Sequence, residues 1–180
     1  MKKTTILFSL LVVFIATVSA QVPRFTKYQI NETGRYAYFP EDPGIFEVEP
    51  SEDGSDVYTG EVLFVKDFQS CHYGIIMVDF TDGMMDELDK EGLEGVLISY
   101  LDYLKQSFSI TESTGYGKGH TLESNPDAVG VIDYWVDVDK TPWEIKGWID
   151  KNTLAVMFIY GEKLPEEGYQ EMFLNGFRFN

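Results

Sequence analysis

The residues of this sequence that could act as nucleophiles or bases are few. Cys71 is the only cysteine, and it stands beside His72, one of two histidines. A cysteine nucleophile needs a base within hydrogen-bond reach and a group that orients that base. Neighbouring residues of a strand point to opposite faces of a sheet, and this pair precedes the apolar run 73–80. We therefore expect the two side chains to lie apart and Cys71 to be a buried, unreactive thiol.

Three glycines at alternate positions, Gly115, Gly117 and Gly119, suggest a phosphate-binding loop at first sight. A dinucleotide fingerprint follows a strand, opens a helix and spaces its glycines as G-x-G-x-x-G. This run follows a predicted helix and a short predicted strand at 108–111, and its third glycine is misplaced. It therefore predicts a flexible turn. His120 has no second histidine or cysteine near it in sequence, so we expect a solvated side chain and no zinc site.

Acidic residues gather between Asp79 and Glu94. They are Asp79, Asp82, Asp86, Glu87, Asp89, Glu91 and Glu94. Only Lys90 opposes them. Hard cations such as calcium bind several carboxylate oxygens, so this stretch is the strongest candidate metal site, although its spacing does not match an EF-hand. A solvated acidic surface is the simpler interpretation.

Three tryptophans, Trp135, Trp143 and Trp148, are the candidate partner contacts. In a strand predicted over 129–138, alternation places Trp135 on the same face as Asp133, with the polar residues, which leaves an exposed Trp135 open as one alternative. Trp143 and Trp148 fall on opposite faces of the next strand, so at most one should face a core. An exposed aromatic on an acidic sheet could bind a partner protein or a glycan, whereas a covering layer would bury it.

Strands must position most of these residues. Alternating apolar and polar residues bounded by turn residues predict strands at residues 35–39, 45–49, 57–66, 71–80, 108–111, 129–138, 143–149 and 154–160. The pair Lys151-Asn152 predicts a tight hairpin between the last two strands, because Asn tolerates the positive φ that such turns need. We expect the segment 21–28 to be a mobile arm.

Two helices are predicted among these strands. The first carries one apolar stripe, formed by Leu93, Val96, Leu97, Tyr100, Leu101, Leu104 and Phe108. Asp89 is its expected N-cap. The second helix should begin near Pro165, end at Gly176, and place Tyr169, Met172, Phe173 and Leu174 near the sheet. Runs of strands joined by short turns, with helices between them, predict an α+β fold in which helices flank an antiparallel sheet.

The charge balance excludes two classes of partner. The chain has 14 Lys and Arg residues against 30 Asp and Glu residues, with a formal net charge of -16. Like charge repels nucleic acid and anionic membrane surfaces, and no basic stripe offsets that repulsion. The composition, 44% hydrophobic and 24% charged, can bury the core of one domain. A single cysteine forms no intrachain disulfide, so packing must stabilise the fold.

The first residues predict an export signal. Lys2 and Lys3 precede the apolar run 6–16, and Val18-Ser19-Ala20 is a small-residue cleavage site. The run is shorter than the roughly 20 apolar residues of a membrane-spanning helix. No cysteine follows the cleavage site to accept a lipid. We expect removal of residues 1–20, no membrane insertion afterwards, and a single secreted or periplasmic domain over residues 21–180.

Several strings of the sequence resemble PsbP-like domains, especially the small secreted ones of bacteria. In order, they are Tyr36-Ala37-Tyr38-Phe39-Pro40-Glu41-Asp42-Pro43, the amphipathic helix after the fourth strand, Gly115-Tyr116-Gly117-Lys118-Gly119, Gly147-Trp148-Ile149, Asn152-Thr153-Leu154-Ala155-Val156-Met157, and Phe173-Leu174-Asn175-Gly176-Phe177-Arg178-Phe179. The resemblance implies an α/β/α sandwich, as in the oxygen-evolving-complex extrinsic protein and a Ran-binding nuclear transport factor. Relatives of that fold are binding or assembly proteins without a shared catalytic centre. The high acidity, and a missing Pro before a Gly after the first helix, depart from the pattern.

The sequence as a whole predicts a binding or assembly module that uses no cofactor and is not an enzyme. It would recognise an envelope or extracellular protein, or a small ligand. The alternative is a calcium-associated accessory protein that uses the acidic surface clusters.

Overall fold

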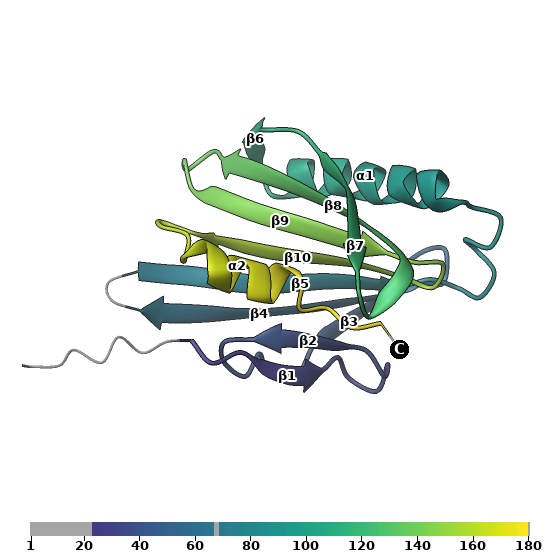
Figure 1. Ribbon diagram of the computed structural model, residues 1–180, viewed down its shortest axis with the longest axis horizontal. Coiled ribbons are helices and arrows are strands. Elements are labelled where there is room, and N and C mark those ends of the chain that lie inside the picture. The colour runs from purple at the N-terminus through teal and green to yellow at the C-terminus, as the bar shows by residue number, and fades with distance from the viewer. Residues whose placement is uncertain (1–22, 67–68, 180) are drawn as a thin grey trace, which may run out of the picture.

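The computed structural model describes residues 23–66 and 69–179 (Figure 1). The signal peptide predicted over residues 1–20 lies outside the described residues. Within the described part, no helix combines the length and the apolar character needed to cross a membrane.

Eight strands of the described chain form one antiparallel sheet. Their order is β3-β4-β5-β10-β9-β8-β6, and β7 also pairs with β8. The strands are β3 (Glu47–Pro50), β4 (Asp56–Lys66), β5 (Gln69–Asp79), β6 (Ile110–Ser113), β7 (Gly117–Leu122), β8 (Asn125–Asp137), β9 (Pro142–Ile149) and β10 (Thr153–Gly161). The long strands β4, β5, β10, β9 and β8 form the body of the sheet, so each of its faces can carry a core.

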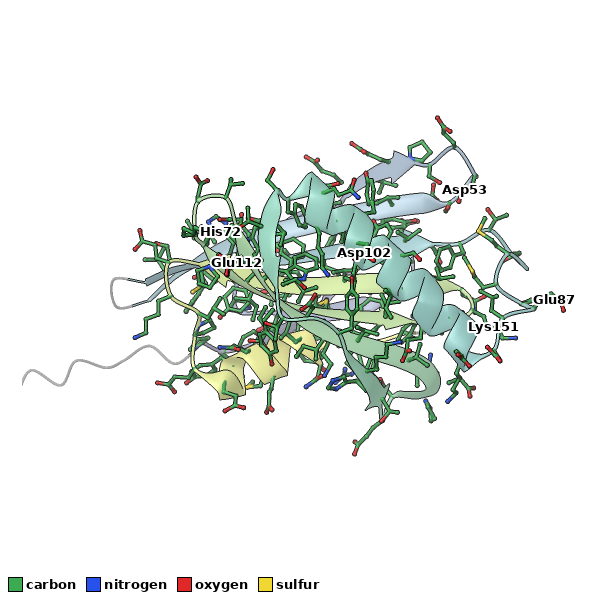
Figure 2. The ribbon with its side chains drawn as sticks, turned by 90° about the horizontal axis from the view of Figure 1, so that it is seen from above. Asp53, His72, Glu87, Asp102, Glu112 and Lys151 are labelled. Atoms are coloured by element: carbon green, nitrogen blue, oxygen red, sulfur yellow. The ribbon has the colours of Figure 1, made fainter. Side chains whose placement is uncertain are left out.

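Helix α1 (Lys90–Ser107) lies across one face of the sheet (Figure 2). Its predicted N-cap is confirmed, because the Asp89 side chain accepts a hydrogen bond of 2.9 Å from the amide of Gly92. The buried stripe is Leu93, Leu97, Leu101 and Leu104. Leu97 of the helix lies over Gly147 of β9, which has no side chain to separate the two elements.

The opposite face carries a hairpin of β1 (Thr26–Gln29) and β2 (Tyr36–Phe39), together with α2 (Glu167–Leu174). Aromatic rings fill the core between these layers: the centroids of Phe39 and Phe173 lie 5.2 Å apart. The indole of Trp148 donates a 2.8 Å hydrogen bond to the Leu174 carbonyl, which ties α2 to β9. Met172, predicted to lie near the sheet, is instead exposed.

The molecule is therefore a mixed, predominantly β fold with antiparallel sheets and two helices in its described part, which confirms the predicted α+β class. Two strands escaped prediction. Residues 26–28 of the expected mobile arm belong to β1, and Gly117 and Gly119 of the expected flexible turn belong to β7. The β9–β10 turn needs no positive φ at Asn152, because the Asp150 side chain accepts 2.8 Å hydrogen bonds from the amides of Asn152 and Thr153.

Candidate functional site

The three tryptophans proposed as partner contacts are buried. Trp135 is 1% exposed, so the alternative of an exposed Trp135 is wrong. Trp143 and Trp148 do lie on opposite faces of β9, but both faces are covered, so the expectation that at most one faces a core is also wrong. The interpretation that a second layer covers these rings is confirmed.

Asp133 explains why alternation misplaced Trp135. Its carboxylate shares the α1-facing side of β8 with Trp135 and is fully buried. The Trp135 indole, the Ser113 hydroxyl and the Lys105 ammonium lie 2.6, 2.7 and 3.1 Å from one carboxylate oxygen. The amides of Gly115 and Tyr134 donate to the other oxygen. A carboxylate with this many donors can be buried, so the acidic residue does not mark a solvent face.

Cys71 and His72 point to opposite faces of β5, as predicted. The Cys71 thiol is buried, donates to the Lys163 carbonyl at 2.9 Å, and has its pKa raised by burial. His72, labelled in Figure 2, contacts Glu61 at 2.6 Å through Nδ1 and stacks on Tyr160. The thiol and the imidazole therefore cannot act as a nucleophile and its base.

The acidic stretch 79–94 is used for structure at several positions. Asp79 forms an ion pair with Arg35 at 2.9 Å, and Glu94 contacts Lys118 at 2.8 Å. Asp89 caps α1. In the described part of the chain, no three His, Cys, Asp or Glu side chains gather as ligands of a metal ion. This arrangement favours the solvated, structural interpretation of the acidic stretch over a calcium site.

A polar groove between β7, β9 and the segment after α2 is the strongest candidate site. Figure 1 shows the turn between β7 and β8 beside the C-terminal segment. The groove has a volume of about 680 Å³ and is lined by Thr121, Leu122, Glu123, Ser124, Lys146, Asn175 and Arg178. In a chain of net charge -16, this groove stands out because its lining holds two cations, Lys146 and Arg178, against one acid, Glu123.

Lys146 is the central residue of this polar groove. It projects from β9 toward the α2 side and is only 7% exposed. Its ammonium donates to the Asn175 side-chain oxygen at 2.9 Å and lies 4.8 Å from the centre of the Trp148 ring. No carboxylate of a described residue lies within 4.0 Å of it. Burial lowers the pKa of Lys146, although Glu171 and Glu144 partly counteract this.

Arg178 adds a second cation to the polar groove. Its backbone pairs with Tyr36, so the segment after α2 is fixed beside the β1–β2 hairpin. One guanidinium nitrogen donates to the carbonyls of Asn175 and Phe177, at 2.8 and 2.7 Å. The same group lies 5.4 Å from the centre of the Tyr38 ring. These neutral partners fix the side chain but leave its charge without a carboxylate among the described residues.

Two titratable groups near Lys146 are shifted toward their uncharged forms. The pKa of Glu144 is raised to about 7, mainly by burial; Lys146 opposes this shift, and Glu167 and Glu171 add to it. Burial and the charge of Lys146 lower the pKa of His120 on β7. Glu144 and His120 do not line the polar groove, but their shifted pKa values show that the surroundings of Lys146 are desolvated, which is common at binding sites.

Sequence analysis missed this site. Glu144 and Lys146 were part of a predicted strand and no role was assigned to them. The available signal was their alternation with Trp148: a lysine that shares a strand face with a core tryptophan is itself close to the core. Asn175 and Arg178 lie about thirty residues further along the chain, and no local pattern links them to β9.

Comparison of the chain with protein-family models, curated proteins and solved structures found no match. The resemblance to PsbP-like domains therefore remains a prediction from the sequence.

Proposed function

We propose that this protein is an exported, non-catalytic binding module with a PsbP-like α/β/α arrangement, and that its polar groove binds a small organic anion. The observation that carries the proposal is the burial of Lys146 without a carboxylate partner among the described residues. A buried charge is normally paired, because desolvation makes an isolated one costly. A ligand carboxylate or phosphate supplies the missing partner.

The groove offers donors of several kinds to such a ligand. An ammonium has three N–H donors, and Asn175 is the one hydrogen-bond acceptor of Lys146 among the described side chains. Arg178 provides further N–H groups, and the hydroxyls of Thr121 and Ser124 provide neutral donors. Hydrogen bonds to charged groups contribute about 1.5–3 kcal/mol each, so two or three of them give selectivity for an anion over a neutral analogue.

The proposal is tested by comparing the anion affinity of the mature wild-type chain with that of the Lys146→Met variant. Methionine has a similar length and no charge, and a buried charge can be replaced by an apolar group without loss of stability. Citrate and inorganic phosphate are the probes, measured by calorimetry and by tryptophan fluorescence, because Trp148 lies beside Lys146. We expect at least one probe to bind to the wild type, and Lys146→Met to weaken its binding about tenfold or more, which corresponds to 1.4 kcal/mol.

Lys140→Met is the matched control for this test. Lys140 is 70% exposed and its contact to Glu112 lies on the surface, so its loss should leave anion binding unchanged. Equal affinity in Lys146→Met and wild type, or no binding of either anion by wild type, would contradict the proposal.

Export is the second part of the proposal. It rests on the basic, apolar and small-residue pattern of residues 1–20. The mass of the protein recovered from the periplasm or the medium should correspond to a chain that begins at Gln21. A full-length chain retained in the cytoplasm would contradict export and would leave the proposal for the groove intact.

A further inference from the structure

Strand β4 has an edge that its neighbour covers only in part. On the inner side it pairs with β5 along its whole length, from Asp56 to Lys66. On the outer side, β3 pairs only with residues 56–59. No backbone group of another described segment pairs with the outer side of the seven residues 60–66, here called the free edge. Unpaired backbone donors and acceptors in a row are a template for a further strand.

The middle of the free edge, residues 62–65, carries no charged residue or proline that would block pairing. On the α1-facing side of β4, Leu63 is 45% exposed and Val65 is 63% exposed. Natural edge strands are usually blocked by charges, prolines or bulges. The β3 edge has these devices in Glu47, Glu49 and Pro50, whereas the middle of the free edge is apolar. The carboxylate of Glu61 accepts hydrogen bonds from His72 and Tyr160, so it is held on its own sheet.

We propose that two copies of this chain pair through their free edges, antiparallel and centred on Leu63, to form one continuous sheet. A two-fold axis perpendicular to a sheet reverses strand direction and keeps each face on its own side. Paired residues must therefore have the same parity, and pairing about Leu63 meets this condition. Glu61 then lies opposite Val65, Val62 opposite Phe64, and Leu63 opposite itself. Lys66 comes opposite Gly60, against which the Phe46 ring of its own chain already packs.

The positions of the acidic residues on the free edge are compatible with a second copy of the chain as the partner. Each chain carries a large negative charge, so an interface between copies must keep acids apart. In this register no acid faces an acid, and each Glu61 lies opposite a valine. The Leu63 pair and the flanking Val65 side chains lose contact with water on the α1-facing side. The interface is isologous, the usual form in symmetric dimers.

The first test measures the mass of the mature chain over a wide range of protein concentration by sedimentation equilibrium. We expect a monomer–dimer equilibrium in wild type and a monomer in Leu63→Lys, because the substitution places two ammonium groups opposite each other on the axis. The matched control is Met172→Lys, which changes another exposed apolar residue, on α2, and should still dimerise. A wild type that stays monomeric at all concentrations would overturn the proposal.

A cysteine at the axis tests the register itself. Residues directly opposite in an antiparallel pair have Cα atoms about 4.5–5.5 Å apart, within the range of a disulfide. Leu63→Cys should therefore give an oxidised dimer, whereas Met172→Cys should not, and the buried native Cys71 should not interfere. A dimer that tolerates Leu63→Lys, or in which Leu63→Cys does not cross-link, forms elsewhere and would refute this interface. These results are independent of anion binding in the groove.

Discussion

Glu144 titrates in the neutral range because β9 places it under α2. Its carboxyl is 6% exposed, and burial raises its pKa from the usual 4.5 to about 7. Between these two values the folded protein holds a proton at Glu144 that the unfolded chain has released. The free energy of unfolding therefore falls as pH rises through this window, and the stabilisation present below pH 4.5 is lost above pH 7.

Glu144→Gln tests this titration, because glutamine imitates the protonated acid at every pH. We expect the variant to match wild type near pH 4.5 and to be more stable at pH 8 by about 1–3 kcal/mol, with the lost attraction to Lys146 reducing the gain. Urea unfolding at several pH values measures the difference. Glu112→Gln changes an exposed acid and should follow the wild-type curve. Parallel curves for Glu144→Gln and wild type would show that Glu144 keeps its ordinary pKa.

The burial of apolar residues was predicted well from the sequence, and the burial of charged residues was predicted poorly. The stripe of α1 and the burial of Cys71 followed from local pattern. The burial of Asp133 did not, because several of its donors, on Ser113, Gly115 and Lys105, lie more than fifteen residues away in sequence. Lys146 is a similar case, since its partner Asn175 follows α2. Local sequence shows that a side chain is charged, but the topology decides whether that charge has a partner.

At the level of elements, the contact between α1 and β9 depends on Gly147. A Cβ at this position would lie 2.5 Å from a methyl carbon of Leu97, which is fully buried and cannot move aside freely. We expect Gly147→Ala to lower the free energy of unfolding by about 1–3 kcal/mol through overpacking. Urea unfolding measures the change.

Gly95→Ala provides the contrast for that experiment. Gly95 is exposed on α1, and a Cβ there would meet nothing within 4 Å. Alanine should therefore stabilise the helix by about 0.5–1 kcal/mol. Adding Leu97→Ala to Gly147→Ala should recover part of the lost stability relative to the sum of the single changes. If the effects of Leu97→Ala and Gly147→Ala on the free energy of unfolding are strictly additive, Leu97 does not pack against Gly147.

Long periodic elements were predicted closely, whereas the short strands β1 and β7 were missed. The patterns of α1 and of β4, β5, β8, β9 and β10 extend over many residues, so both their type and approximate bounds were predicted correctly. Strand β1 has four residues, and among the described strands it pairs with β2 alone. Helix α2 has eight residues, and its apolar residues Met172, Phe173 and Leu174 are consecutive, so only part of this run can face the sheet. Tertiary packing buried Phe173 and Leu174 and left Met172 exposed.

For the molecule as a whole, negative charge is the dominant electrostatic feature. The formal net charge is -16, and six ion pairs are found among the described residues. Self-repulsion of like charges destabilises a compact state, and salt screens it. Because so few pairs exist to be weakened, added NaCl should raise the melting temperature.

Comparing the melting temperature in calcium chloride and in magnesium chloride distinguishes general screening of charge from binding at a calcium site. If the acids act only through their summed charge, calcium and magnesium chloride at equal ionic strength should raise the melting temperature equally, since each cation screens the same field. We expect this result, because the described acids at Asp79, Asp89 and Glu94 are held by protein partners. Calorimetric scans in the two salts, with NaCl as reference, measure it. A larger shift in calcium, saturating with concentration, would indicate specific binding to the folded state and would favour the calcium-associated function.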